Sequence, residues 1–440
     1  MSDRLMRWKR YIALGPVLSS ALIIACLHGA SQGHDAGILV LVNGTLVDGA
    51  GADPLPDAVL VVKGNRIQAV GARGAVPMPQ PGRIVDVGGA TILPGFINAH
   101  VHDAYNPQNL EAWALAGVTT VRDEGILLGY ASLQELLARR DNEWNRPQYA
   151  RLVSSGWMIT APEGYGRLFV SSPADARRKV LDELDQGADL IKFSLEDGYG
   201  PRSDLPILSS EEVTAIVVAA HERGALVSAH ITEATYLQKV VDAGVDDVAH
   251  VAWDPVSDEL MQRMVEKDIF VLPTLTVMEA YGVLSGSQAN LQRFVAMGGQ
   301  VALGNDYTDV PQNGFDHFEL GMPMHEIGRM SEAGMTPMQV IVAATKNASH
   351  VCSLEKELGT LEAGKLADVL VVHGDPLADI HALAHVRLVL KGGVVIRDDP
   401  TPALSDASGP QPTALPAVRP ARQHRAATEP LGSKIGGGRR

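Results

Sequence analysis

Residues 93–102 read LPGFINAHVH and place His100 and His102 one residue apart at the end of an apolar run. The run is strand-like, and side chains two residues apart on a strand point to the same side, so both imidazoles can converge on one object, most simply a metal ion. The spacing alone is weak evidence, because a chain with 14 histidines among 440 residues contains about 0.4 such pairs by chance. The rest of the chain has to supply the context.

Seven further apolar runs follow, each typical of a strand buried on both faces of a parallel sheet. They are GVTTVRD, RLVSSGWMIT, ADLIKFS, LVSAHI, DDVAHV, IFVLPTLT and QVALGND. Helical stretches separate several of them, such as residues 209–224, which open on a Ser209/Glu212 capping box and close on Gly224. Eight strands alternating with helices over roughly 260 residues indicate a (β/α)8 barrel, but a doubly wound sheet has the same alternation.

The two ends of this alternating region have a different pattern, of short β-branched strands joined by turn signals such as Gly64-Asn65 and Gly392-Gly393. Residues 36–92 and 356–398 can therefore form one small β domain that brackets residues 93–355. Residues 399–440 are rich in Pro, Ala, Gly, Ser and Arg and have almost no apolar periodicity. They predict a disordered tail.

The N-terminal segment MSDRLMRWKR carries four basic residues and precedes the apolar run YIALGPVLSSALIIACL. This is the pattern of an export signal, and the run is short for a membrane-spanning helix. We expect residues 1–26 to direct export of the chain. The exported protein would lie in a bacterial periplasm or be anchored to the membrane as a lipoprotein, or otherwise be secreted. The end of the run, LIIAC, resembles a lipobox with Cys26 as the lipid-anchored residue. A signal peptide cut near Ala30 is the alternative.

Composition excludes several classes of partner. The formal net charge is −14 at pH 7, which argues against nucleic acid or an anionic membrane surface, since both require clustered basic residues. Besides Cys26 only Cys352 is present, so no disulfide framework is expected. A small-molecule substrate is the expected partner; homo-oligomers are possible, but nothing in the sequence specifies an interface.

Polar residues follow the predicted strands at their C-terminal ends. They are His100 and His102 (first strand), Lys192 (fourth), His230 (fifth), His250 (sixth) and Asp306 (eighth). Any one of them could be a structural hydrogen-bonded residue or a helix cap. The C-terminal strand ends of a barrel open onto one mouth, so together they predict ligands for one or two divalent ions.

With these motifs the chain resembles the amidohydrolase superfamily, and within it the group of imidazolonepropionases and Xaa-Pro dipeptidases, from about residue 38 to residue 398. The resemblance is carried by LPGFINAHVH, GVTTVRD, IKF, AHI, AHV, LGND and the closing GTLEAGKLADVLVVHGDP. It implies an α/β fold, a metal-dependent (β/α)8 TIM barrel over residues 93–355. The strands of residues 36–92 and 356–398 would form a composite β-sandwich.

The resemblance also implies a ligand set for two divalent ions. His100, His102 and Asp306 would hold one ion, and His230 and His250 the other. Lys192 would bridge the two as a CO2-derived carbamate, because an ammonium group cannot ligate a cation. The alternative is a Lys192 that pairs with a nearby acid such as Glu196 or Asp197. Imidazole and carboxylate ligands suit zinc best, although manganese, cobalt or nickel could bind.

Such a centre predicts hydrolysis by a metal-bridging hydroxide, with Asp306 moving the proton to the leaving nitrogen. The expected reaction is cleavage of an amide or peptide-type C–N bond, as in an Xaa-Pro dipeptide or an N-acyl amino acid. A cyclic amide or lactone hydrolase is one alternative. A catalytically silent exported metal-binding protein is another.

Three loops depart from the family pattern. TAPEGYGRLF stands where a Gly-Gly-His type segment is usual, the acidic SLEDGYG follows Lys192, and the eighth-strand loop continues as Asn305, Asp306 and Tyr307. Tyr165, Tyr199 and Tyr307 are candidate substrate contacts, with loop packing as the alternative. Arg122 and Asp123 could orient a substrate carboxylate, but we expect them to pair with each other.

Overall fold

The computed structural model describes residues 37–102, 104–126, 132–198, 204–309 and 318–400. The predicted export signal, with Cys26, and the predicted tail from residue 401 onward lie outside the described residues. The compact unit that contains the strands ends at Asp399. Within the described ranges, no helix combines the length and the apolar character needed to cross a membrane.

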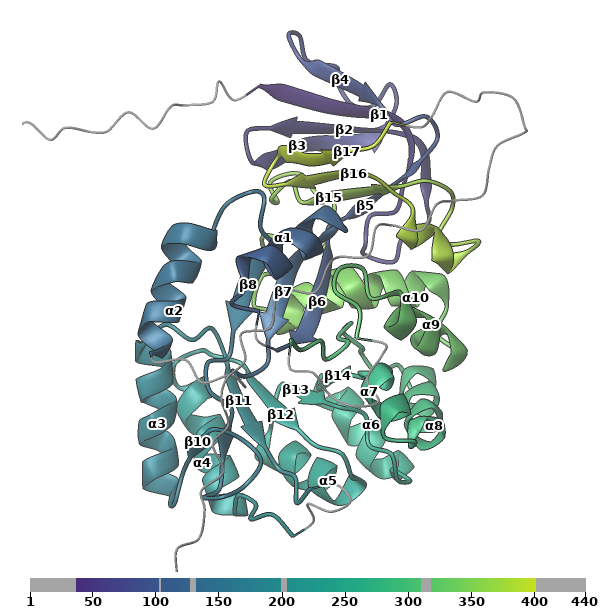
Figure 1. Ribbon diagram of the computed structural model, residues 1–440. Coiled ribbons are helices and arrows are strands. Elements are labelled where there is room, and N and C mark those ends of the chain that lie inside the picture. Colours follow the sequence, from purple (N-terminus) through teal and green to yellow (C-terminus); the bar gives the residue numbers. More distant parts are fainter. Residues whose placement is uncertain (1–36, 103, 127–131, 199–203, 310–317, 401–440) are drawn as a thin grey trace, which may run out of the picture. The chain divides into compact units, whose positions relative to one another are not determined.

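Strands from both ends of the chain form one sheet of eight strands, with β15 hydrogen-bonded to β5 (Figure 1). Its order is β17-β16-β15-β5-β1-β2-β3, with β4 beside β1; the bounds are β1 Ile38–Leu46, β2 Leu55–Lys63, β3 Arg66–Ala72, β4 Arg83–Asp86, β5 Thr91–Pro94, β15 Val369–Val372, β16 Val386–Lys391 and β17 Val394–Asp398. The predicted turns at Gly64 and at Gly392-Gly393 have positive φ angles (61°, 53° and 76°), as tight hairpins require. The described strands pair as a single sheet, so a second, facing sheet of the predicted sandwich is not seen among them.

The middle of the chain contains two parallel sheets, drawn at the centre of Figure 1. The first has the order β6-β7-β8 and the second β10-β9-β11-β12-β13-β14. Their bounds are β6 Phe96–Val101, β7 Val118–Asp123, β8 Arg151–Ser154, β9 Ile159–Thr160, β10 Leu168–Phe169, β11 Ile191–Ser194, β12 Val227–His230, β13 Asp247–Ala249 and β14 Phe270–Leu272. Every residue of β6, β7, β11, β12, β13 and β14 is buried, which is why these strands read as continuous apolar runs.

The predicted eighth strand is irregular. Val301 bridges Val271, and Tyr307 bridges Val101, both in parallel orientation, so the segment runs between β14 and β6 without forming a regular strand. Gly304 lies so close to β6 that a Cβ atom there would be 2.5 Å from the Cβ of His100. The described ladders therefore remain two sheets, and a closed barrel is not seen in them.

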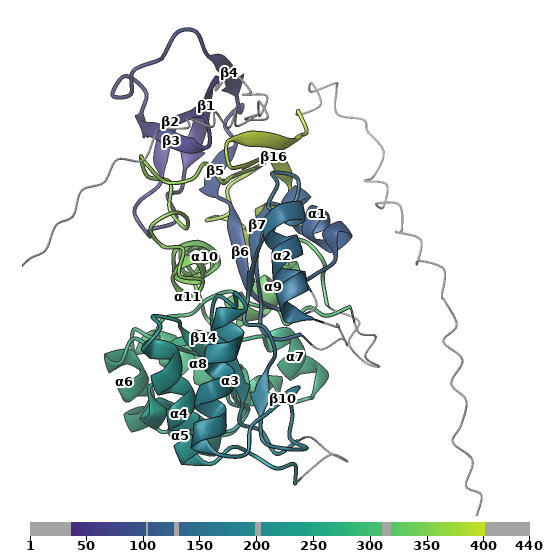
Figure 2. The same ribbon diagram turned by 90° about the vertical axis from the view of Figure 1, so that its left-hand side faces the viewer.

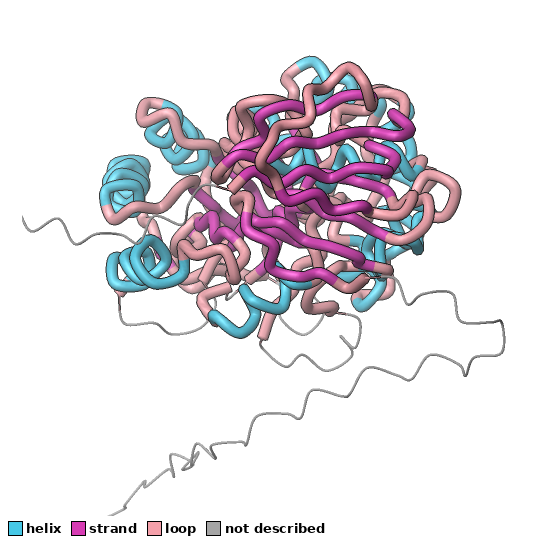
Figure 3. The backbone as a smooth tube through the Cα atoms, turned by 90° about the horizontal axis from the view of Figure 1, so that it is seen from above, coloured by secondary structure: helices cyan, strands magenta, loops and turns pink. Residues whose placement is uncertain are grey.

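Helices flank the parallel strands, with α2 and α3 on the left and α6, α8 and α9 on the right in Figure 1, and Figure 2 shows α2 and α3 in front. Figure 3 shows the mixed sheet and several of these helices from above. The predicted capping box is confirmed, since the Ser209 hydroxyl accepts from the Glu212 amide and the Glu212 carboxylate accepts from the Ser209 amide. The helices are α1 Pro107–Leu115, α2 Leu133–Arg139, η1 Arg140–Trp144, α3 Pro173–Asp185, α4 Ser210–His221, α5 Ala234–Ala243, α6 Asp258–Glu266, α7 Leu275–Ala280, α8 Leu284–Ala296, α9 Met324–Glu332, α10 Pro337–Val342, η2 Ala343–Asn347, α11 Ala348–Val351 and η3 Ile380–Ala384.

Candidate metal centre

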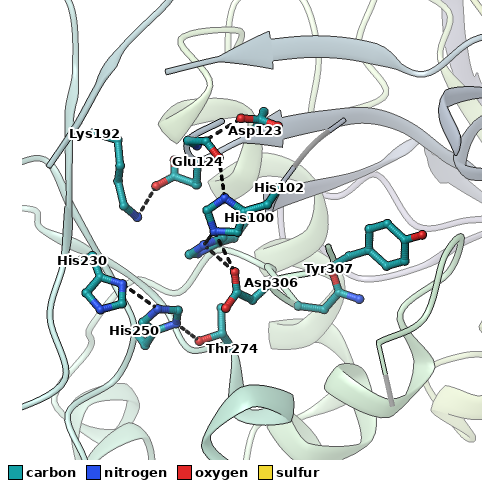
Figure 4. Close-up of polar contacts among 12 residues, drawn as sticks. His100, His102, Asp123, Glu124, Lys192, His230, His250, Thr274, Asp306 and Tyr307 are labelled. Atoms are coloured by element: carbon teal, nitrogen blue, oxygen red, sulfur yellow. Dashed lines mark hydrogen bonds and ion pairs between the residues drawn. The ribbon is translucent and has the colours of Figure 1, made fainter. Parts of the chain in front are cut away.

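His100 and His102, from the end of β6, converge on Asp306 (Figure 4). The Nε2 atoms of both histidines lie 3.0 Å from Oδ1 of Asp306 and 3.4 Å from each other. His102 Nδ1 donates to the carbonyl oxygen of Gly125 at 2.7 Å, so in the neutral imidazole Nε2 is the nitrogen that keeps its lone pair. Among the described residues, no donor makes a hydrogen bond of normal geometry to the buried Oδ1 of Asp306. Electron-pair donors that face one another in this way fit a divalent cation.

The second pair, His230 and His250, comes from the ends of β12 and β13. Nδ1 of His230 lies 3.1 Å from Nε2 of His250. Their outer ring nitrogens have partners of their own, since His230 Nε2 lies 2.6 Å from the Glu196 carboxylate and His250 Nδ1 contacts the Thr274 hydroxyl. The His250 ring stacks on that of His100 with centroids 5.1 Å apart, so the two histidine pairs are neighbours.

Lys192 is buried beside them and pairs with an acid that sequence reasoning missed. Its Nζ lies 2.5 Å from Oε2 of Glu124, and both side chains are fully buried. Oε2 also accepts from the Ser228 hydroxyl at 2.7 Å, while Oε1 lies 2.8 Å from the Arg122 guanidinium. Of the two candidate acids named from the sequence, Glu196 faces His230 instead.

The expected pair of Arg122 with Asp123 is wrong. Arg122 pairs with Asp247 at 2.8 Å and with Glu124, while the Asp123 carboxylate accepts from the amides of Ala104 and Gly125. Adjacent residues of a strand point to opposite faces, so the side chains of Arg122 and Asp123 diverge.

The ion network and the burial shift the pKa values of these groups. Burial lowers the pKa of His100 to about 4. In His102, burial acts downward but the nearby Asp306 carboxylate outweighs it and raises the pKa to about 9. Burial also opposes ionisation of Asp306, yet the imidazoles of His100 and His102 hold its pKa well below its usual range. Asp306 is therefore an anion positioned between two imidazoles.

Comparison with known proteins identifies the family. Residues 91–396, more than half of the chain, match the amidohydrolase family. The chain belongs to the amidohydrolase family. It is thus an enzyme, a hydrolase acting on C–N bonds, and the resemblance inferred from the motifs is confirmed.

Several relatives of this amidohydrolase match most of its length. An ochratoxinase from Aspergillus niger is 26% identical over 436 residues, covering 82% of this chain and 87% of that protein. An imidazolonepropionase from Symbiobacterium thermophilum is 25% identical over 393 residues, covering 76% and 90%. The crystal structure of a Xaa-Pro dipeptidase with bound methionine in the active site has a TM-score of 0.70 and 23% identity, covering 82% of this chain and 99% of that one.

The tyrosines predicted to contact substrate fall into different places in this amidohydrolase. The Tyr165 ring lies 4.9 Å from the His230 ring and is partly exposed at the site. Tyr307 points away from the histidines (Figure 4), packs edge-on against Trp113 and donates its hydroxyl to Asp309 at 2.7 Å. Tyr199 lies outside the described residues.

Three polar residues near the candidate site were not predicted to lie there. Glu124 directly follows β7, Thr274 lies just beyond β14, and Tyr281 directly follows α7. Burial, together with the charges of Asp306 and Glu196, raises the pKa of Tyr281 to about 12, so this phenol lies within electrostatic reach of the candidate site. The first two share the signal that identified the histidines, a polar residue just past a parallel strand.

Proposed function

We propose that this amidohydrolase cleaves an amide or peptide-type C–N bond in a small molecule, such as an Xaa-Pro dipeptide or an N-acyl amino acid, by metal-dependent hydrolysis. The observation that supports it most is the convergence of His100, His102 and Asp306, with both Nε2 atoms 3.0 Å from one carboxylate oxygen. The names of the relatives, an ochratoxinase and a Xaa-Pro dipeptidase, favour the same class of bond.

Two divalent ions fit the donor set, one on His100, His102 and Asp306 and one on His230 and His250. When bound, such ions supply Lewis acidity towards a carbonyl and a water of lowered pKa. Asp306 retains partial access to solvent, with 15% of its side chain exposed. It can accept a proton from the attacking water and pass it to the leaving nitrogen.

We also propose that zinc is the native metal and that Lys192 bridges the two ions as a carbamate. The Lys192 ammonium would first lose one proton to become an amine, and addition of that amine to CO2 would release a second, leaving an anion with two oxygen donors. The buried position of Nζ beside the histidines supports this role. Carboxylation requires the lysine to give up its contact with Glu124, 2.5 Å away.

The same proposal extends to the architecture and the location of the chain. The two parallel sheets would close into a (β/α)8 barrel over residues 93–355, and residues 36–92 with 356–398 would form the composite domain. The N-terminal pattern supports export, with or without a lipid on Cys26. Intact mass of the mature protein distinguishes lipidation at Cys26 from cleavage near Ala30.

The test is a panel of Xaa-Pro dipeptides, N-acyl amino acids, cyclic amides and lactones, offered to the metal-loaded enzyme. Turnover of the linear amides supports the proposal. Turnover of lactones or cyclic amides alone would assign the alternative hydrolase activity. A chain that binds metal and turns over none of them would be a metal-binding protein, and the proposal would be wrong.

A further inference from the structure

We propose that Glu196 is a positioning residue that fixes the imidazole of His230 for metal binding. The inference rests on the proposed metal centre and adds to it a group outside the predicted ligand set. Glu196 belongs to the acidic segment SLEDGYG after Lys192, where this chain departs from the pattern of the family it resembles.

The backbone brings Glu196 to His230. Strands β11 and β12 are parallel neighbours in which Ser194 pairs with His230. One step further along, the amide of Leu195 donates to the carbonyl of His230 at 3.0 Å, so the ladder continues past the end of the strand. Glu196 follows at once, and its side chain is placed alongside the imidazole.

The contact determines which ring nitrogen of His230 is bare. Oε2 of Glu196 lies 2.6 Å from Nε2 of His230, and both side chains are buried, with 1% and 7% exposed. A carboxylate only accepts, so Nε2 carries the hydrogen and Nδ1 keeps its lone pair. Nδ1 is the atom that faces Nε2 of His250, 3.1 Å away.

Two further rings pack near the His230 imidazole, since the centroid of Tyr165 lies 4.9 Å from it and that of His250 lies 4.7 Å from it. The Glu196 carboxylate adds a directional hydrogen bond to this ring packing and so fixes the orientation of the imidazole. Carboxylates that accept from the outer nitrogen of a metal-binding histidine raise its basicity and fix its tautomer. Loss of such a partner typically weakens metal affinity about 10- to 100-fold.

The test compares Glu196→Leu and Glu196→Gln with the parent enzyme and with a matched control, Asp197→Asn. Asp197 is the adjacent acid, and its carboxylate is bonded to Tyr236. Cobalt titration followed by visible absorption measures the affinity of each of the two sites. We expect Glu196→Leu to weaken the second site about 10- to 100-fold and to leave the first unchanged. Glu196→Gln keeps a hydrogen-bond acceptor, so its second-site metal affinity should fall by less. In Asp197→Asn that affinity should change less than about threefold.

A second measurement needs no variant. The ¹⁵N shifts of the histidine side chains in the metal-free enzyme report which nitrogen of His230 carries hydrogen, and we expect Nε2. If Glu196→Leu does not fold, this measurement and the metal affinity of Glu196→Gln test whether Glu196 positions His230. Hydrogen on Nδ1, a second site of parental affinity in Glu196→Leu, or a parent enzyme that binds only one ion would each overturn the inference.

These outcomes are separate from the failure of the proposed function. An enzyme whose second-site affinity depends on Glu196 but which hydrolyses no amide would retain the inference and lose the proposed substrate class. An enzyme that hydrolyses linear amides but whose second-site metal affinity is unchanged in Glu196→Leu would retain the proposed function and lose the inference.

Discussion

The Nζ of Lys192 lies 2.5 Å from Oε2 of Glu124, in a contact from which water is excluded. Arg122 approaches the other oxygen of Glu124 and pairs with Asp247 as well. The positive charges of Lys192 and Arg122 are therefore balanced by the negative charges of Glu124 and Asp247. Carboxylation of Lys192 would replace one of the cations by an anion next to Glu124. The observed ion pair and the proposed carbamate would thus compete for the same lysine.

Replacing Glu124 by Gln should favour the carbamate, because it removes the negative charge beside it. We expect the bicarbonate concentration that gives half-maximal metal loading to fall roughly tenfold, since a buried charge pair at this distance is worth more than 1.4 kcal/mol. This bicarbonate concentration is measured by dialysing the protein against a series of bicarbonate concentrations and determining its metal content. The control is Glu135→Gln, at an exposed position. A variant that needs as much bicarbonate as the parent would contradict the competition.

Replacing Asp306 by Asn should abolish turnover while leaving the fold intact. The amide keeps the shape of the side chain but loses both the anionic ligand and the proton acceptor, so we expect kcat/KM to fall about 10³-fold or more. Circular dichroism checks the fold, and the exposed Glu211→Gln serves as control. Activity that survives in Asp306→Asn would rule out the proton transfer assigned to Asp306.

Gly304 should not tolerate a side chain, because an added Cβ would lie 2.5 Å from the Cβ of His100. Gly304→Ala would push the segment that carries Asp306 away from β6, weakening metal binding and costing about 1–3 kcal/mol of stability. Gly328→Ala is the control, since a Cβ at this helical position meets nothing within 4 Å. Thermal unfolding measures the loss of stability, and elemental analysis measures the loss of metal. Equal stability and metal content in the two variants would show that the close approach of Gly304 to His100 matters for neither.

Glu183 gives the metal-free chain a pH-dependent stability. Burial raises its pKa to about 8, although its carboxylate accepts from the Trp157 amide. The folded state therefore holds a proton that the unfolded state releases near its ordinary pKa of about 4.5, and stability falls as pH rises from about 4.5 to about 8.

Glu183→Gln removes that titration and keeps an acceptor for Trp157. Between pH 5 and pH 9 we expect the free energy of unfolding of the parent to fall by about 2–4 kcal/mol more than that of the variant. Urea unfolding of both metal-free proteins at the two pH values measures it. Parallel pH dependence would mean that Glu183 stays ionised when folded.

The strand ends were predictable because their signals are local. His100 and His102 share a face through the two-residue period of β6, and His230 and His250 close neighbouring strands, so the order along the chain gave the order in the sheet. The capping box at Ser209 was predictable for the same reason.

What the sequence did not reveal depends on contacts between distant segments. Glu124 and Lys192 are 68 positions apart, and only the packing of β7 near β11 decides that they meet. In the predicted eighth strand Gly304 passes close to His100, and the positive φ of Asp306 (57°) turns the chain out of strand geometry there. Tyr307 packs against Trp113 on α1, a contact between distant segments that the sequence offered only as loop packing, the alternative to substrate contact.

The most direct test of the central claim is the metal content of the purified mature enzyme, measured by elemental analysis beside Lys192→Ala. We predict two divalent ions per chain in the parent, zinc foremost, and fewer in the variant. A parent chain with no stoichiometric metal under conditions that preserve the fold would contradict the metal-dependent mechanism. One ion in both proteins would show that Lys192 does not bridge.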